Sequence, residues 1–140
     1  MDIQIQENKK ANKYRNIILQ AGEKTLSFMG KEKKSLGVLI TDEHQIRQLN
    51  KKFRNTDEPT DVLAFPYGEK RSPYLGDIAI SLIQAKEQAK TYKEKIEDEL
   101  ARLVIHGVLH LLGETDYTSK SKEKMWAKQE KILTSLKEKK

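Results

Sequence analysis

The segment that most restricts the fold of this chain is residues 103–112, with the sequence LVIHGVLHLL, which is apolar except for His106 and His110. A helix that is apolar on all of its sides is buried inside a protein. We therefore predict a helix over residues 94–112 whose second half lies in the core. Its first half, KEKIEDELAR, is rich in charged residues and is expected to face solvent on most sides.

Hydrophobic periodicity predicts an alternation of strands and helices in the rest of the chain. Alternating or contiguous apolar residues predict strands at residues 2–6, 36–40, 61–65 and 76–82. Apolar residues at helical spacing predict helices at residues 14–29, 42–52, 82–92 and 119–136. Thr41 is expected to cap the helix that begins at residue 42, and Gly30 to end the helix before it. The pattern predicts an α/β (α+β) fold, with a small mixed β-sheet of about four strands covered by helices.

The length and the absence of cysteine narrow the class of protein further. A chain of 140 residues is expected to form one domain, over residues 1–140, because typical domains contain about 100–150 residues. Without cysteine there are no disulfides, no thiolate metal ligands and no cysteine nucleophile, so histidines and carboxylates remain as the strong metal ligands. The first ten residues hold no apolar stretch that resembles a signal peptide, and no segment is long enough to span a membrane. A cytoplasmic protein is expected.

The charge of the chain is compatible with a polyanionic partner. Twenty-seven basic and 21 acidic residues give a formal net charge of +6. A positive balance attracts RNA, DNA or a ribosome over long distances, whereas an excess of lysine also occurs on ordinary solvated helix faces. The charge alone does not choose between these two explanations.

His106 and His110 are candidate ligands for one metal ion. Side chains at positions i and i+4 lie on one face of a helix, about one turn apart, where two imidazoles can share an ion. Two imidazoles without partners in a buried segment would be energetically costly. A metal satisfies both of them, and hydrogen bonds within the core are the alternative.

The residues next to the histidine pair bear on the chemistry of the site. Gly113 is expected to end the helix and to turn the chain back over the histidine face. A third ligand would then come from Glu114, Asp116 or Tyr117. Zinc proteases place a glutamate directly after the first histidine, and this chain has Gly107 there. Hydrolysis of phosphodiesters therefore fits the site better than hydrolysis of peptides.

Three blocks of sequence carry a family resemblance. The blocks are LNKKFRNTDEPTDVLAFP, LGDIAIS and HGVLHLLG, and they extend over about residues 49–113. In this order they resemble the YbeY family of metal-dependent endoribonucleases, whose hallmark is a helix that reads H-G-x-L-H-L-x-G-Y-D-H. Three ordered blocks are much more specific than a histidine pair alone. The resemblance implies that the single domain is of the metal-hydrolase type.

The resemblance also points to a third metal ligand. The third histidine of the family lies ten residues after the first, and counting ten residues from His106 reaches Asp116. The expected metal ligands are therefore His106, His110 and Asp116, with Glu114 or Tyr117 as the fallback. One Zn²⁺ per chain is the expected cofactor, and an aspartate in place of histidine shifts the preference toward other divalent metals such as manganese. The alternative for Asp116 is a turn residue before the last helix.

Arg54 and His106 are the catalytic residues that the resemblance implies. A guanidinium carries a permanent charge and forked donors that suit a phosphate. Without the resemblance, an ion pair of Arg54 with Asp57 or Asp61 that holds the turn would be the simpler role. Thr60 and Asp61 are expected to tie the loop to the next strand, or to support the metal ligands from outside.

The function that the resemblance implies is single-strand-specific RNA cleavage in the 3′-end maturation of 16S ribosomal RNA and in ribosome biogenesis. Its partners would be ribosomal RNA and ribosomal particles, with no membrane and no DNA. Two alternatives stay open, an RNA-binding ribosome-assembly factor with a structural metal and a zinc hydrolase of other substrates. A fourth protein ligand such as Glu114 would favour the structural metal, because closed tetrahedral coordination leaves no position for water.

Overall fold

A mixed sheet of four strands runs through the molecule, which a computed structural model describes over residues 3–6, 9–69 and 71–138. The strands are β1 (Ile3–Gln6), β2 (Ser35–Thr41), β3 (Val62–Pro66) and β4 (Tyr74–Ser81). Their order in the sheet is β1-β2-β4-β3. Strand β2 pairs in parallel with β1 on one side and with β4 on the other, whereas β3 runs antiparallel to β4 at the edge. The predicted mixed sheet of about four strands is confirmed.

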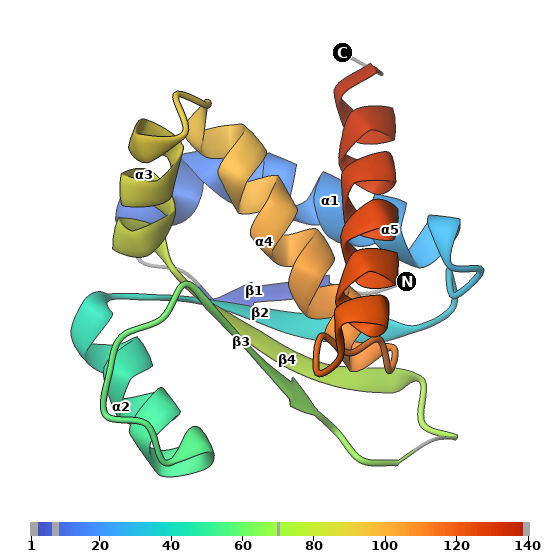
Figure 1. The fold of residues 1–140 in the computed structure, drawn as a ribbon, viewed down its shortest axis with the longest axis horizontal. Helices are drawn as coiled ribbons and strands as arrows, with labels where there is room; N and C mark the ends of the chain where they lie inside the picture. The colour runs from blue at the N-terminus through green and yellow to red at the C-terminus, as the bar shows by residue number, and fades with distance from the viewer. Residues whose placement is uncertain (1–2, 7–8, 70, 139–140) are drawn as a thin grey trace.

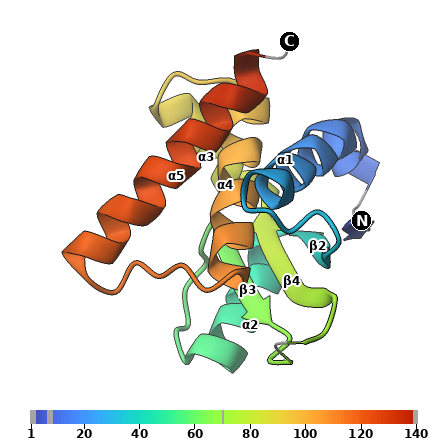
Figure 2. The ribbon, with the colours of Figure 1, turned by 90° about the vertical axis from the view of Figure 1, so that its right-hand side faces the viewer.

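The helices divide unequally between the two faces of the sheet. They are the 3-10 helix η1 (Lys9–Tyr14) and the α-helices α1 (Arg15–Phe28), α2 (Glu43–Arg54), α3 (Leu82–Thr91), α4 (Ile96–Leu111) and α5 (Ser119–Glu138). Four α-helices gather on one face, and α2 lies alone on the other (Figure 1). The view turned by 90° shows the same separation (Figure 2). Among the described residues, no helix is long and apolar enough to cross a membrane.

Strand β4 serves the cores on both faces of the sheet. Successive side chains of a strand point to opposite faces. Ile78 and Ile80 are fully buried in the large core beneath the four helices. Ala79, between them, packs with Ile46 and Leu63 in a small core beneath α2. Alternate residues of β4 therefore pack into the cores on opposite faces of the sheet.

Helix α4 is the centre of the helical layer. It contacts α1, α3, α5 and the strands β3 and β4, and Val104 and Leu109 are fully buried. A Cβ atom on Gly107 would lie 2.8 Å from Cγ2 of Ile78, so the missing side chain lets the helix approach β4 closely. This approach brings the side chains next to Gly107 beside the edge strand β3.

The chain turns back on itself where α4 ends. Gly113 has a φ of +99°, in the region that favours glycine. The N–H of Glu114 donates to the carbonyl of Leu109 at 3.0 Å and closes the turn. The loop that follows brings Asp116 to within 3.8 Å of His110 before α5 begins. The return over the histidine face is the one that the sequence predicts.

The cap of α2 differs from the prediction. Asp42, and not Thr41, caps the helix, because its carboxylate accepts a hydrogen bond from the N–H of Gln45 at 2.7 Å. Thr41 is the last residue of β2, and its hydroxyl donates to the carbonyl of Ile80 at 3.1 Å. The strand pairing therefore holds the threonine, and the aspartate after it is the first side chain free to cap.

The first half of α4 is more buried than predicted. Glu99, Leu100 and Ala101 are at most 3% exposed. Helices α3 and α5 both pack on α4, and Lys137 of α5 pairs with Asp98. Arg102 pairs with Glu99 at 2.8 Å. The prediction of a solvent-facing half was wrong, because a charged pair on one helix can be covered by its neighbours.

Candidate metal centre

Two imidazoles from α4 meet at the wall of one cavity. His106 and His110 lie one turn apart and are both partly buried. Their Nε2 atoms are 3.1 Å apart, and their ring centroids are 4.6 Å apart. The i and i+4 spacing thus brings both rings to one face, with their Nε2 atoms at hydrogen-bond distance from each other.

Asp116 completes a group of three ligand atoms. Its Oδ2 lies 3.8 Å from Nε2 of His110, and one atom of each of the three residues lies within 4.8 Å of the others. In the part of the chain that the structure describes, this is the one group of three or more such residues with this geometry. Zinc bonds of about 2.0–2.2 Å allow up to about 4.3 Å between two donor atoms. The imidazole pair fits this limit, and the Asp116 side chain is 42% exposed and free to turn toward an ion.

The surroundings of His110 favour its neutral form. Burial lowers the pKa of His110, and the neighbouring His106 lowers it further. Asp116 and a hydrogen bond with the backbone of Glu114 act in the opposite direction, and the net direction is downward. A histidine binds a metal only when it is neutral. The lowered pKa therefore favours the form that can hold an ion.

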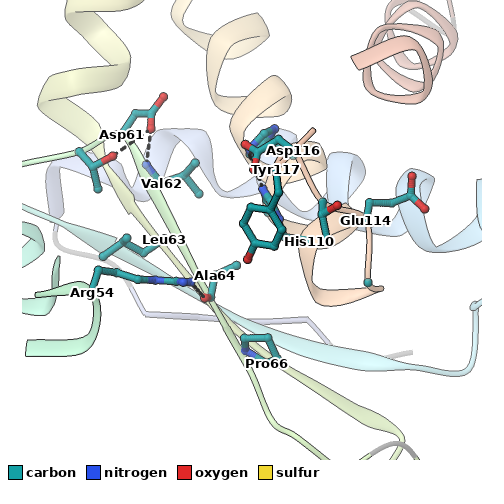
Figure 3. A pocket seen from close by; sticks show the side chains of 15 residues that line it. Arg54, Asp61, Val62, Leu63, Ala64, Pro66, His110, Glu114, Asp116 and Tyr117 are labelled. Carbon is teal, nitrogen blue, oxygen red and sulfur yellow. Dashed lines mark hydrogen bonds and ion pairs between the residues drawn. The ribbon is translucent and has the colours of Figure 1, made fainter. Parts of the chain in front are cut away.

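The three ligand atoms open into a cavity of about 470 Å³, called the histidine cavity below. Its walls come from α4, from the edge strand β3, from the end of α2 and from the loop after Gly113. Arg54 lies at one wall, and His110 and Asp116 lie at the other, with Ala64 of β3 between them (Figure 3). An elongated anion in this cavity would contact the ligand group and the guanidinium together.

Arg54 is held by the edge strand and forms neither of the ion pairs considered above. Its Nη2 donates to the carbonyl of Ala64 at 2.7 Å. Asp57 accepts instead from Nε of Arg47 at 2.8 Å. A guanidinium has five donors, so a single bond to Ala64 fixes its position while others can reach a ligand in the cavity.

Asp61 ties the loop to its surroundings, as expected. Its Oδ1 accepts from the N–H of Val62 at 2.8 Å and from the hydroxyl of Thr60 at 3.4 Å. Its Oδ2 accepts from Nε2 of Gln88 on α3 at 3.1 Å. Both Thr60 and Asp61 line the histidine cavity, but Asp61 is not a member of the ligand group.

The fallback ligands lie outside the group. Oε2 of Glu114 pairs with Nζ of Lys128 at 3.1 Å, and its carboxylate points away from the cavity (Figure 3). Tyr117 is 83% exposed and stands at the mouth of the cavity. The remaining histidine, His44, is exposed at the start of α2, far in sequence from the group.

Sequence reasoning missed the residues behind the imidazole of His106. Gln129 of α5 lies 2.8 Å from Nδ1 of this ring. Arg102 pairs with Glu94 at 2.6 Å and with Glu130 at 3.1 Å. The i and i+3 spacing of Glu99 and Arg102 was a usable signal for part of this network, whereas Gln129 carries no signal in the sequence.

The fold and the site define an α/β protein with a candidate metal centre in an open cavity. The sequence assigns it to a family, because the chain matches Endoribonuclease YbeY over residues 2–137. The chain belongs to the YbeY family, and the predicted resemblance is confirmed. It is thereby a member of a family of nucleases, which are hydrolases.

Individual relatives support the same assignment. Endoribonuclease YbeY of Aquifex aeolicus is 40% identical over 91% of this chain and 86% of its own length. Endoribonuclease YbeY of Carboxydothermus hydrogenoformans is 43% identical over 86% of this chain and 85% of its own length. The solution structure of TM1509 from Thermotoga maritima superimposes with a TM-score of 0.70 at 31% identity, over 97% of this chain and 89% of that one. The α/β fold is thus shared with a solved structure.

Proposed function

We propose that this chain is a metal-dependent endoribonuclease that cleaves single-stranded RNA, with a divalent ion held by His106, His110 and Asp116. The observation that carries the proposal is the group of three ligand atoms within 4.8 Å of one another. Arg54 faces this group across the histidine cavity. The names of the relatives, Endoribonuclease YbeY, support RNA as the substrate.

Zinc is the proposed metal, at one ion per chain. Two nitrogens and one carboxylate oxygen form a ligand set that zinc accepts, and three protein ligands leave a position open. When bound, the ion lowers the pKa of a water molecule and polarises a phosphoryl oxygen, which is the chemistry that phosphodiester hydrolysis requires. The ion pair of Glu114 with Lys128 supports an open position, because it keeps the nearest additional carboxylate occupied.

Arg54 and His106 are the proposed catalytic residues. His106 serves the reaction as a metal ligand. Arg54 holds the scissile phosphate and stabilises the negative charge that develops on it, because preorganised donors at such a position lower the barrier. The bond of Arg54 to the Ala64 carbonyl supports this role, since it fixes the guanidinium before the substrate arrives.

The biological setting of the proposal comes from the family resemblance. We propose ribosomal RNA as the substrate, 3′-end maturation of 16S ribosomal RNA as the reaction, ribosomal particles as partners and the cytoplasm as the location. The net charge of +6 supports a polyanionic partner.

The test compares RNA cleavage before and after removal of the metal. Purified protein is treated with a chelator, dialysed, and assayed on a single-stranded RNA and on the same RNA paired with its complement. Cleavage of the single strand is expected to stop on chelation and to return with Zn²⁺ or Mn²⁺, with the duplex left intact. A His106→Ala/His110→Ala protein purified in parallel controls for contaminating nucleases.

Two results would contradict the proposal. Full cleavage by protein shown by elemental analysis to be metal-free would exclude the metal role. Zinc-loaded protein that binds RNA without cutting it would support instead the assembly factor with a structural metal.

A further inference from the structure

We propose that Gln129 is a positioning residue of the metal centre, which fixes the tautomer of His106 so that Nε2 of this histidine is the atom free to bind an ion. The inference rests on the proposed metal role of His106 and extends it to a residue on another helix. Gln129 belongs to α5, and its side chain is buried, with 7% of the residue exposed. Its Oε1 lies 2.8 Å from Nδ1 of His106.

The orientation of the Gln129 amide follows from its second contact. Its Nε2 donates to Oε2 of Glu130 at 3.2 Å. The same carboxylate oxygen accepts from Nε of Arg102 at 3.1 Å. A carboxylate in an ion pair only accepts hydrogen bonds. The amide nitrogen must therefore face Glu130, and the amide oxygen must face His106.

This orientation determines which nitrogen of His106 carries the proton. An amide oxygen accepts hydrogen bonds and does not donate them, so Nδ1 of the imidazole must be the donor. A neutral imidazole has one N–H, and Nε2 is therefore unprotonated. Nε2 is also the atom that lies 3.1 Å from Nε2 of His110, on the side of the ligand group. A hydrogen bond on the second nitrogen commonly orients a metal-binding histidine in this way.

Arg102 anchors the chain of contacts. Its guanidinium binds Glu94 at 2.6 Å and Glu99 at 2.8 Å, besides Glu130. These bonds join the first half of α4, and Glu94 two residues before it begins, to α5. Forked bonds to several carboxylates hold a guanidinium in one orientation. Arg102 thereby fixes the carboxylate of Glu130, Glu130 orients the amide of Gln129, and Gln129 accepts from His106.

A second cavity reaches the same network from behind. It has a volume of about 640 Å³, and Arg102, Gln129 and Glu130 line it together with His106. Water could therefore replace the amide if residue 129 were shortened to alanine. Methionine has nearly the length of glutamine and neither donates nor accepts well, so Gln129→Met removes the contact without opening room for water.

The direct test is the tautomer of His106 in metal-free protein, read by long-range ¹H–¹⁵N NMR. In the parent protein His106 is expected to carry its proton on Nδ1. In Gln129→Met, whose fold is checked by circular dichroism, we expect a mixture of the two tautomers. Gln88→Met is the matched control, because Gln88 lines the same cavity and its amide binds Asp61, not a histidine. It is expected to keep the parent tautomer.

Zinc affinity is the second readout. Loss of a hydrogen-bonding partner behind a metal ligand typically weakens metal binding about 10–100-fold, and Gln129→Met is expected to fall in this range in competition with a chelating dye. The double variant Gln129→Glu/Glu130→Gln keeps an acceptor opposite Nδ1 and supplies an amide donor to it from position 130, without a second negative charge. We expect it to keep the Nδ1–H tautomer and most of the affinity. Gln88→Met is expected to bind zinc as the parent does.

The inference is overturned if Gln129→Met keeps the Nδ1–H tautomer and binds zinc within about twofold of the parent. It is also overturned if Gln129→Glu/Glu130→Gln behaves like Gln129→Met in both measurements, because the effect would then come from packing. The NMR result does not depend on metal. A parent protein that binds no zinc would refute the proposed function, while the tautomer would still decide the role of Gln129.

Discussion

The two faces of the sheet carry cavities of nearly equal size and very different chemistry. The histidine cavity, of about 470 Å³, lies between α4, the edge strand β3 and the end of α2. On the side of α2, a cavity of about 480 Å³ is lined by Phe53 and Phe65 and is called the phenylalanine cavity. These two rings meet edge to face with centroids 5.2 Å apart. Volume alone therefore does not distinguish a candidate reaction site in this protein.

The difference lies in α4, which borders only the histidine cavity of these two. Helix α4 is buried among its neighbours and presents two imidazoles in one fixed direction. Helix α2 has only Ile46 and Asn50 buried. The one titratable pair in the lining of the phenylalanine cavity is Tyr74 and Asp77, which are joined by a hydrogen bond. A site needs side chains held by packing, and α4 is the helix that provides it.

The largest expected contrast between the cavities is in metal retention. His110→Ala removes a ligand and is expected to weaken zinc binding by more than about 100-fold, since partners behind a ligand are already worth about 10–100-fold. Leu49→Ala in the phenylalanine cavity is expected to leave the metal content unchanged. Elemental analysis of both dialysed proteins measures the contrast. Equal zinc in His110→Ala and the parent would remove His110 from the ligand set.

The next contrast lies between two arginines of α2. Arg54→Ala is expected to keep the fold and the zinc and to lower RNA cleavage about 100-fold, as for the loss of one charge-stabilising donor. Arg47→Ala is the matched control. Its pair with Asp57 is more than half exposed on both sides, so it is expected to change neither cleavage nor stability measurably. Steady-state rates of RNA cleavage measure the contrast. Full activity of Arg54→Ala would show that Arg54 has only a structural role, through its bond to the Ala64 carbonyl.

A smaller effect is expected from restoring the family's third histidine. Asp116→His replaces an oxygen donor by a nitrogen, and we expect about tenfold tighter binding of zinc and weaker binding of manganese, because imidazole suits zinc and carboxylate suits manganese. Calorimetric titrations with each metal measure the two shifts. Unchanged affinity for both ions would place Asp116 outside the coordination sphere.

The smallest effect concerns the phenylalanine cavity and appears only in alkali. Burial, together with the hydrogen bond to Asp77, raises the pKa of Tyr74 to about 12. The unfolded-state pKa of tyrosine is about 10. The stability contributed by this group is therefore complete below about pH 10 and is lost as the pH rises toward 12.

The tyrosinate absorbance of the folded protein measures this titration. We expect a component that titrates near pH 12 in the parent and is missing in Tyr74→Phe. The same variant is expected to keep zinc and RNA cleavage, which separates the two cavities again. If Tyr74→Phe instead loses a component that titrates near pH 10, as an ordinary tyrosine does, the assignment of the raised pKa to Tyr74 is contradicted.

Local patterns predicted the parts of the site that lie close together in the chain. The spacing of His106 and His110 places both rings on one helix face, and Gly113 turns the chain back so that Asp116 joins them. Residue spacing was enough for the histidine pair and the turn, whereas the choice of Asp116 over Glu114 and Tyr117 came from the family resemblance. The strands and α-helices follow from apolar periodicity in the same way, whereas the 3-10 helix η1 and the cap at Asp42 were not predicted.

Contacts between distant segments were beyond reach of the sequence. The bond of Arg54 to the Ala64 carbonyl depends on how α2 meets β3. The contact of Gln129 with His106 depends on the packing of α5 against α4, and so does the burial of Glu99. No periodicity or motif encodes which side chain of one helix faces a given atom of another.

The most direct test of the account is a crystal structure of the protein grown with zinc, with the ion located by anomalous scattering. We expect one ion per chain at about 2.0–2.2 Å from Nε2 of His106, Nε2 of His110 and a carboxylate oxygen of Asp116, with one coordination position not filled by protein. At saturating zinc, an absence of anomalous density there, with the two imidazoles hydrogen-bonded to each other, would contradict it.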